Sequence, residues 1–266
     1  MIAEDSQDSH AALAAILSSP ADRDTFDLIR AIDGLADAMG PAEAERMLER
    51  DPGLLGIRPA LSSEFNAYVV RLETADTRKL LETEIEAPAS FRSLATPNAM
   101  GMLNRLADLA AHVAKPGMQR IVMVGCGWRP VTMFYLHETT DAREIIGLDV
   151  VPDAVDSAAA LARKLGYDRM RTELCDGASF DYAGADLVYV ASMVSPKRAV
   201  IARILETAPE DVRIVLWEPI SLGRLWLESS FPDQIPQLEI TGRGPIVRLS
   251  QDVFTRRRRP GADGGP

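Results

Sequence analysis

Beyond residue 117, the chain alternates between short apolar runs and segments with helical periodicity. The runs at residues 121–124, 144–149 and 186–191 are nearly continuous in apolar side chains, and turn residues bound them. Such runs are typical of strands buried on both faces of a parallel sheet, and the 153–165 segment has the spacing of a helix. The pattern predicts an α/β fold with a doubly wound, mostly parallel sheet and right-handed crossovers.

The first part of the chain differs, because residues 9–113 show helical periodicity throughout. Small polar residues before periodic segments predict helix N-caps, and a Gly-Pro pair predicts a helix end. We expect an N-terminal all-helical domain, residues 1–115, then a break at Lys115-Pro116-Gly117 and a sheet domain, residues 116–255. The predicted helices run from Asp24 to Gly40-Pro41, then to about Arg50, from Ser62 to Ala87, and from Thr96-Pro97 to about Ala114.

Residues 256–266 are predicted to form a disordered tail. The arginines at 256–259 precede the turn-rich sequence PGADGGP. A terminal basic run of this kind is usually solvated rather than functional.

A turn between the first apolar run and the next helix holds the clearest candidate chemistry. Gly125-Cys126-Gly127 follows Val124 directly, and two glycines let a backbone turn tightly and approach a ligand closely. Pro130 stands where a dinucleotide fingerprint has its third glycine. The turn therefore predicts a nucleoside ligand without a pyrophosphate.

The second apolar run ends on Asp149, close to the position, about 20 residues after the glycine turn, where a ribose-binding carboxylate belongs. The later turn Leu174-Cys175-Asp176-Gly177 supplies a second carboxylate, which is predicted to reach the adenine amino group. This order of elements is typical of a class I S-adenosylmethionine (SAM) methyltransferase-like, Rossmann-type fold. We expect SAM to contact Gly125, Cys126, Gly127, Trp128, Arg129, Asp149, Val150, Cys175, Asp176, Gly177, Ala191, Ser192 and Met193.

Residues 124–132, VGCGWRPVT, resemble the glycine loop of the nicotianamine synthases, which have a small residue between the glycines, a proline and then a threonine. The resemblance spans roughly residues 80–250. Further segments resemble those of the family in the same order along the chain: Gly147-Leu148-Asp149, Asp153-Ala154, Arg169-Met170, Asp176, residues 190–194, Leu216-Trp217, Gly223-Arg224 and residues 246–249.

The resemblance implies chemistry on the 3-amino-3-carboxypropyl arm of SAM rather than on its methyl group. Nicotianamine synthases and the related opine-metallophore enzymes transfer this arm to an amino-acid amine and release methylthioadenosine. The similar azetidine-2-carboxylic acid synthases instead close the arm on its own amine, so they need no second amino acid. Ordinary methyl transfer remains a third alternative, and a non-enzymatic SAM-binding module a fourth.

Residues 80–86, LLETEIE, resemble the Glu-rich helix end that supplies a catalytic glutamate in that family. The attacking amine must be neutral, so a base is expected. Glu82 and Glu86 are four positions apart and would share one face of a helix, where they would hold an ammonium or take its proton. A helical domain placed as a lid over the sheet edge would bring Glu86 to SAM. The alternative is a solvated acidic face without a role.

The chain departs from the family at residues 96–100, where the expected tyrosine is absent. Either Tyr68, Tyr135 or Tyr189 takes its place, with Tyr135 our candidate catalytic hydroxyl, or the acceptor site is remodelled. A remodelled acceptor site is what a ring-closing enzyme would show.

Two residues after the glycine turn have alternative roles. Trp128 either lies against the sulfonium, an attraction of roughly 0.5–2 kcal/mol, or packs on the N-terminal helices. Arg129 either holds the SAM carboxylate bidentately or reaches solvent. Arg224 is a second candidate for that carboxylate, with a helix surface as its alternative.

Composition limits the partners. A net charge of −10 weighs against nucleic acid, and no segment has the run of about 18 apolar residues that spans a membrane. The acidic start is unlike a signal peptide, so we expect a cytoplasmic protein. Two cysteines exclude a disulfide framework, and the three histidines lack metal-ligand spacing, so no metal is expected. The apolar run 220–227 packs either in the core or against a second subunit in a homodimer.

Overall fold

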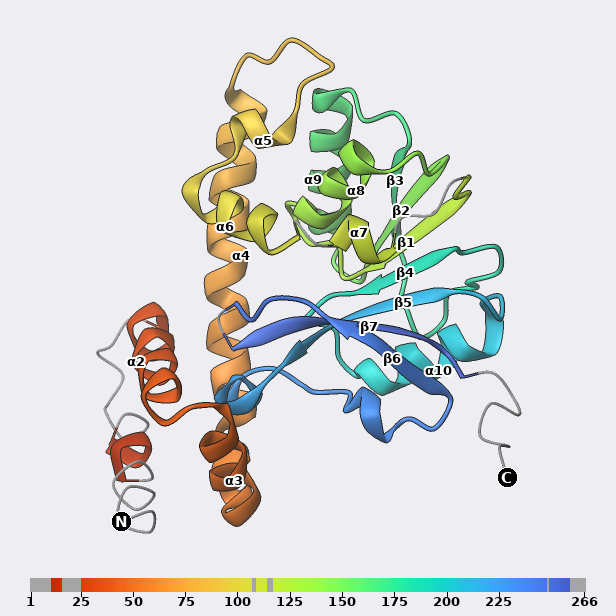
Figure 1. The fold of residues 1–266 in the computed structure, drawn as a ribbon. Helices are drawn as coiled ribbons and strands as arrows, with labels where there is room; N and C mark the ends of the chain where they lie inside the picture. The colour runs from red at the N-terminus through yellow and green to blue at the C-terminus, as the bar shows by residue number, and fades with distance from the viewer. Residues whose placement is uncertain (1–10, 16–24, 107–108, 114–116, 248, 259–266) are drawn as a thin grey trace, which may run out of the picture.

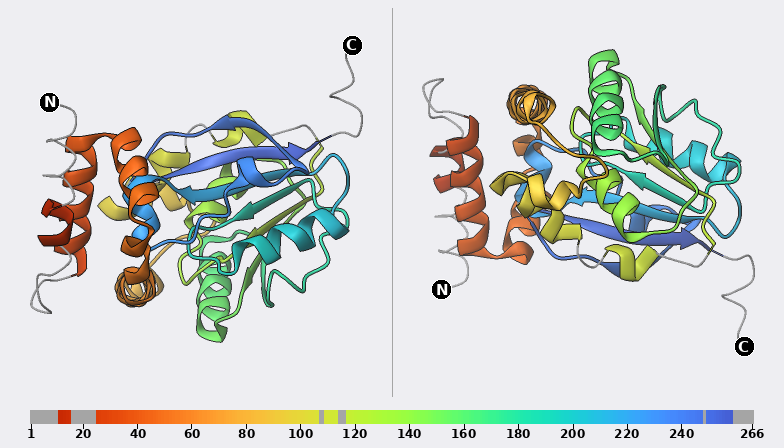
Figure 2. Two further views of the ribbon diagram at one scale, coloured as in Figure 1. Left: turned by 90° about the horizontal axis from the view of Figure 1, so that it is seen from below. Right: turned by 90° about the horizontal axis from the view of Figure 1, so that it is seen from above.

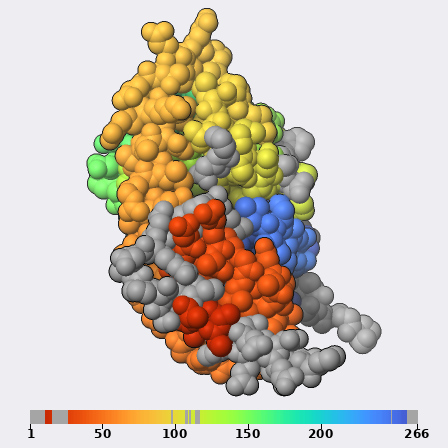
Figure 3. All heavy atoms as spheres, turned by 90° about the vertical axis from the view of Figure 1, so that its left-hand side faces the viewer, coloured from red at the N-terminus to blue at the C-terminus, as the bar shows by residue number. Residues whose placement is uncertain are grey.

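The computed structural model describes residues 11–15, 25–106, 109–113, 117–247 and 249–258. Helices from the first part of the chain stand beside a twisted sheet formed by the second part (Figure 1). The space-filling view from the helical side shows the surface made mostly of these helices, with α4 running along one margin (Figure 3). The helical part therefore lies along one side of the sheet.

The sheet has seven strands in the order β3-β2-β1-β4-β5-β7-β6. Parallel pairing joins β3 through β5, and β7 runs antiparallel to both β5 and β6. The strand order reverses between β1 and β4, which is where open sheets bind ligands beyond their carboxyl ends. The strands are β1 (Arg120–Val124), β2 (Glu144–Asp149), β3 (Met170–Leu174), β4 (Leu187–Val190), β5 (Arg213–Pro219), β6 (Leu238–Arg243) and β7 (Ser250–Arg257).

Helices cover both faces of this sheet, which explains why its central strands are continuously apolar. One core cluster joins α8 (Val131–Thr139), α9 (Pro152–Leu165) and the N-terminal helices to one face. A second cluster joins α10 (Lys197–Thr207) to the opposite face. The predicted doubly wound α/β architecture is confirmed.

The N-terminal helices pack on the segment that follows β5 through a third cluster. Helices α2 (Thr25–Met39) and α3 (Pro41–Arg50) bury Ile32 and Leu48 against the short helix η3 (Ser221–Leu225) and Trp226. The apolar run 220–227 thus lies in the core of the chain, the first of its two predicted environments. Figure 2 shows α4 end-on beside the sheet, with α2 on its outer side.

The longest helix, α4 (Arg58–Glu82), differs from its prediction at both ends. The 3-10 helix η1 (Pro52–Ile57) leads directly into it, so Ser62 is not the N-cap; its hydroxyl instead donates to the Trp226 carbonyl at 2.5 Å. At the other end the chain becomes extended at Thr83, so the prediction of a helix to Ala87 is wrong.

The remaining helices lie next to the sheet domain. Helix α6 (Pro97–Arg105) begins as predicted, with the Thr96 hydroxyl accepting from the Ala99 amide at 3.3 Å. The predicted single helix is described in two parts, α6 and α7 (Leu109–Val113), with residues outside the described part of the chain between them. The other short elements are α5 (Phe91–Leu94) and the 3-10 helix η4 (Pro232–Gln234).

The C-terminal boundary also differs from the prediction. Strand β7 continues to Arg257, and the Arg256 guanidinium donates to Glu239 on the neighbouring strand. Two of the four arginines therefore belong to the sheet rather than to a tail. Residues 259–266, Asp24 and the predicted break at Lys115-Pro116 lie outside the described residues.

Candidate functional site

The glycine turn closes the carboxyl end of β1. Gly125 and Gly127 have φ angles of +77° and +69°, in the left-handed region that glycine adopts without steric cost. The amides of Gly125 and Cys126 both donate to the Leu148 carbonyl, at 2.8 and 3.0 Å. These bonds fix the turn against the end of β2.

Asp149, the last residue of β2, braces the same turn. Its Oδ2 accepts from the Gly127 amide at 2.9 Å, and its Oδ1 accepts from the Val151 amide at 3.0 Å. A carboxylate has about four acceptor positions, so Asp149 keeps capacity for a further donor. Val150 beside it is exposed. The predicted carboxylate is therefore at the predicted strand end, next to the glycine turn.

The turn that follows β4 meets the glycine turn at the switch in strand order. The Ala191 amide donates to the Val124 carbonyl at 3.0 Å. A Cβ at Gly125 would lie 2.8 Å from Val194 and 3.3 Å from Ala191, so the two turns are in close contact. Ser192 is buried and Met193 is partly exposed.

The acidic turn after β3 lies further along the same edge. Asp176 is exposed, and its Oδ1 accepts from the Ala178 amide at 2.8 Å. Gly177 is needed for packing, because a Cβ there would lie 2.5 Å from Val124. Cys175 is partly buried. The predicted cofactor residues thus follow β1, β2, β3 and β4 along one edge, with those of β1, β2 and β4 in direct contact.

Helix α4 crosses this edge and places a carboxylate on it that sequence reasoning missed. A Cβ at Gly127 would lie 2.9 Å from Oε2 of Glu73. The Glu73 carboxylate also accepts hydrogen bonds from the backbone amides of Trp128 and Arg129. The Thr77 hydroxyl, one turn further along α4, donates to the Trp128 carbonyl at 3.3 Å.

Arg129 is buried and paired rather than solvated. Its guanidinium forms an ion pair with Asp76 of α4, and Asp76 also accepts from the Thr96 hydroxyl at 3.1 Å. The Nε of Arg129 has no partner among the described residues. The alternative that Arg129 reaches solvent is wrong. Trp128 beside it is half-buried.

Burial sets the protonation of this site. It raises the pKa of Glu73 to about 7; Arg129 and the two amides oppose the rise, and Asp149 adds to it. Glu73 therefore exchanges its proton near neutral pH. Burial and the charges of Asp149 and Glu73 also raise the pKa of the Cys126 thiol, which agrees with the predicted space-filling role.

The predicted catalytic pair lies elsewhere. Glu82 is the last residue of α4 and Glu86 follows it; both are exposed, and they do not share a helix face. The segment around them packs on the C-terminal end of α9, where Lys164 Nζ donates to the Leu81 carbonyl at 2.6 Å. Helix α9 begins beside the glycine turn, so its other end is about 20 Å away. The prediction that Glu86 comes over the nucleoside site is wrong.

The tyrosine candidates are mostly in the core. Tyr135 is buried within the α8 cluster, and Tyr189 is fully buried with its hydroxyl donating to Asp252 at 2.6 Å. Tyr68 is half-buried on α4, more than one turn before Glu73. Arg224 is paired with Glu45 of α3, so it lies against the helical part rather than on a free helix surface.

Replacing Gly127 by alanine tests the contact between α4 and the turn. The new methyl group would occupy a left-handed position and meet the Glu73 carboxylate, so we expect a loss of about 1–3 kcal/mol in unfolding free energy. Urea denaturation measures it. Gly34→Ala is the matched control: nothing lies within 4 Å of its Cβ, so helix propensity predicts no loss. An equal effect at both glycines would contradict the contact.

Two classes of feature are absent from the described residues. They contain no group of three or more histidine, cysteine, aspartate or glutamate residues that would hold a metal ion. Nor is any described helix both long and apolar enough to cross a membrane.

Comparison with known proteins gives matches among solved structures. No protein-family model and no curated protein matches the chain. A glutamate-to-glutamine mutant of the nicotianamine synthase MtNAS, in complex with SAM, aligns with a TM-score of 0.69. The alignment covers 93% of this chain and 97% of that chain.

The chain has the fold of MtNAS. The sequence identity in that alignment is 19%. MtNAS in complex with MTA and tNA also gives a TM-score of 0.69, with 18% identity over 97% of this chain and 99% of that one. The class I SAM-methyltransferase-like fold with an N-terminal helical part, which the order of elements and the helical periodicity predict, is confirmed.

Proposed function

We propose that the protein is a SAM-dependent enzyme that uses the 3-amino-3-carboxypropyl arm of SAM and releases methylthioadenosine. The observation that carries this proposal is the carboxylate of Glu73, held over the glycine turn by a helix from outside the sheet domain. An amine that attacks either carbon of the sulfonium must first lose a proton, so Glu73 supports an amine nucleophile. The resemblance of the sequence to nicotianamine synthases is what favours the aminocarboxypropyl arm over the methyl group. The fold shared with MtNAS, which was solved in complex with SAM and with MTA and tNA, agrees with this proposal.

Asp149 and the glycine turn would hold the nucleoside. Asp149 keeps acceptor capacity for the ribose hydroxyls, and Gly125 allows close approach of the ligand. The turns at 175–177 and 191–193 would contact the adenine, as the order of strands suggests. These roles are those expected from the sequence, now with the contacts between the turns as support.

Glu73 replaces Glu82 and Glu86 as the candidate base. In the proposed step, Glu73 takes a proton from the ammonium of the acceptor, and the freed nitrogen lone pair attacks the arm carbon bonded to sulfur. The new carbon–nitrogen bond forms as the carbon–sulfur bond breaks. The electron pair of that bond stays on sulfur, which becomes the neutral thioether of methylthioadenosine.

Transfer to an amino-acid amine, as in nicotianamine-like or opine-metallophore biosynthesis, is our first candidate. Cyclisation of SAM to azetidine-2-carboxylic acid is the second, and a specific observation favours it. Tyr135 and Tyr189 are both buried, so neither supplies the hydroxyl that the sequence lacks at residues 96–100. Tyr68, half-buried on α4, is the candidate that is left, and a site that Tyr68 does not reach would suit a reaction without a second substrate.

The products distinguish these reactions. The purified protein is incubated with SAM alone and then with SAM and a pool of amino acids, and the products are identified by mass spectrometry. Methylthioadenosine that forms only with an acceptor indicates transfer. Methylthioadenosine with a cyclic imino acid and no acceptor indicates cyclisation. S-adenosylhomocysteine would contradict both and indicate methyl transfer.

A further inference from the structure

Two carboxylates of α4 lie near the same guanidinium above the glycine turn. Glu73 and Asp76 are three positions apart, so their side chains are neighbours on one face of the helix. The Arg129 side chain, which is 3% exposed, forms an ion pair with Asp76 and, within the described part of the chain, none with Glu73. Asp76 therefore takes the guanidinium that would otherwise be available to Glu73.

A third element holds Asp76 in this pairing. The hydroxyl of Thr96, at the start of α6, donates to the Asp76 carboxylate at 3.1 Å. The Arg129 guanidinium also donates to the Thr96 hydroxyl, at 3.4 Å. The carboxylate of Asp76 thus has a charged donor and a neutral one, and these contacts fix the guanidinium beside Asp76.

The basicity of Glu73 depends on where the Arg129 charge lies. Burial raises the pKa of Glu73 to about 7, the Arg129 charge opposes the rise, and the charge of Asp149 adds to it. The Cys126 thiol also interacts with Glu73, but burial raises the pKa of that thiol, so it stays neutral. A guanidinium in direct contact with a carboxylate lowers the pKa of the carboxylate by about 1–3. Direct pairing would therefore leave Glu73 a weaker base near neutral pH.

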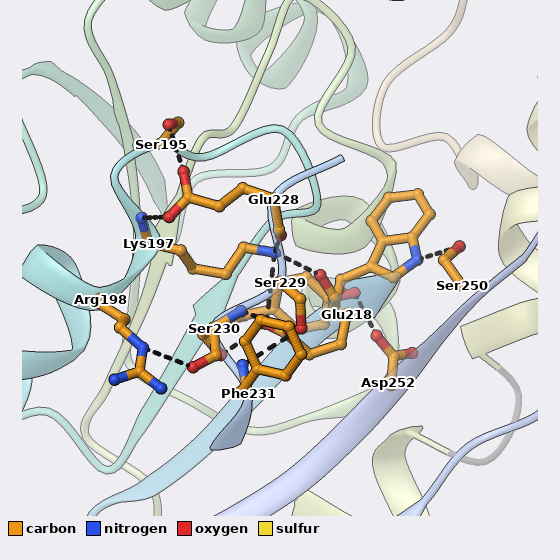
Figure 4. A network of polar contacts seen from close by, with 12 residues as sticks. Ser195, Lys197, Arg198, Glu218, Glu228, Ser229, Ser230, Phe231, Ser250 and Asp252 are labelled. Carbon is orange, nitrogen blue, oxygen red and sulfur yellow. Dashed lines mark hydrogen bonds and ion pairs between the residues drawn. The ribbon is translucent and has the colours of Figure 1, made fainter. Parts of the chain in front are cut away.

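Another ion pair of the chain is closed within the interior. Lys197 lies 3.3 Å from Glu218, and the two side chains are 0% and 3% exposed. Glu218 also accepts from the Ser229 hydroxyl at 2.9 Å (Figure 4). Asp76 differs, because its side chain is 16% exposed and the candidate base is its neighbour on the same helix. The pair of Asp76 and Arg129 is therefore placed to act on the site.

We propose that Asp76 is a positioning residue for the candidate base. By pairing with Arg129, Asp76 keeps that guanidinium from pairing directly with Glu73, so Glu73 can take a proton from the substrate ammonium. The inference rests on the proposed role of Glu73 as the base. Its electrostatic part needs no substrate, because Asp76 acts on Glu73 whether or not SAM is bound.

Carbon-13 NMR of the carboxyl groups tests the proposal without substrate. The full-length protein, labelled at its glutamate carboxyl carbons, is titrated with pH, and the signal lost in Glu73→Gln identifies Glu73. We expect a midpoint of about 7 for Glu73 in the wild-type protein. In Asp76→Asn the released guanidinium should move to Glu73 and lower the midpoint by about 1–3. An unchanged or raised midpoint in Asp76→Asn would overturn the proposal.

The wild-type titration is itself a test that needs no variant. A Glu73 midpoint below the ordinary glutamate value of 4.5 would mean that Arg129 already pairs with Glu73, and it would overturn the proposal.

A double variant shows whether Asp76 acts through Arg129. In the Arg129→Met background no guanidinium can move to Glu73, so adding Asp76→Asn should change the Glu73 midpoint little. An equal fall in both backgrounds would contradict the proposal, because Asp76 would then act by its own charge. Ser229→Ala is the matched control for loss of a polar contact at a buried ion pair, and it should leave the midpoint at about 7.

The reaction rate separates this inference from the proposed function. In Asp76→Asn, the pH at which methylthioadenosine formation rises should fall together with the NMR midpoint, and the limiting rate should decrease. The expected NMR shifts without any methylthioadenosine from the wild-type protein would refute the proposed function and support the effect of Asp76 on Glu73. Methylthioadenosine formation with an unchanged midpoint in Asp76→Asn would refute the role of Asp76 alone.

Discussion

Replacing Glu73 by glutamine should lower the rate of methylthioadenosine formation by about 10²–10⁴-fold, the range for loss of a general base. The amide cannot take the ammonium proton, yet it keeps an oxygen for the backbone amides of Trp128 and Arg129. SAM binding should therefore change little. Single-turnover kinetics with saturating SAM measure the chemical step, and calorimetry measures SAM binding.

The pH dependence of the reaction rate tests the same residue. The base acts as the ionised carboxylate, so the wild-type rate should rise as pH increases through about 7 and then level off. The glutamine variant should lose that rise. The pKa of Glu73 is about 7 in the folded state and 4.5 in the unfolded chain. The free energy of unfolding therefore falls as pH increases from about 4.5 to 7, because the unfolded chain ionises first. The variant should therefore be more stable than the wild type at pH 8. That result would show that its lost activity does not come from misfolding.

The earlier candidates serve as matched controls for Glu73. Glu82 lies on the same helix but is exposed, and Glu86 follows it in an extended segment. Glu82→Gln and Glu86→Gln should leave the rate within about twofold of wild type. A large loss in either of them, with an active Glu73→Gln variant, would contradict the assignment of the base.

Replacing Asp252 by asparagine should lower the unfolding free energy by about 3–5 kcal/mol. Arg105 of α6 and Asp252 of β7 form an ion pair whose side chains are 0% and 2% exposed. The Arg105 guanidinium also donates to the Tyr189 hydroxyl at 2.9 Å and lies 4.0 Å over the Trp217 ring. The substitution leaves a buried cation without its counter-ion, which is why the expected loss is large. Urea denaturation measures it.

A double variant separates the charge from the packing. Arg105→Met combined with Asp252→Asn removes both charges, so it should be less destabilised than Asp252→Asn alone. The exposed pair Arg30 and Asp27 provides the control, and Asp27→Asn should cost less than about 1 kcal/mol. Equal losses at the two aspartates would contradict the role of burial.

The sheet was predictable because its signal is local. Continuous apolar runs predict β1, β2 and β4, and Asp149 marks the end of β2. The end of α4 was not predictable in the same way, because apolar Ile85, four positions after Leu81, continues the pattern beyond it. At the helix end, Lys164, distant in sequence, donates to the Leu81 carbonyl, a tertiary contact that periodicity does not report.

The candidate site was predictable only on its sheet side. The glycine turn, Asp149 and the 191–193 turn follow strands whose order the sequence indicates. The position of the Glu73 carboxylate depends on how α4 packs across a turn more than fifty residues later, and periodicity does not report that packing. A partial signal existed: Glu73, Asp76, Thr77 and Leu80 have the spacing of one helix face, so two carboxylates share the face that buries Leu80.

Labelled SAM tests the central claim most directly. SAM carrying deuterium in the methyl group and carbon-13 in the aminocarboxypropyl arm is incubated with the wild-type protein and amino acids, and the products are resolved by mass spectrometry. We expect methylthioadenosine that keeps all the deuterium and a second product that keeps all the carbon-13. Deuterium in an acceptor, with carbon-13 in S-adenosylhomocysteine, would contradict the account.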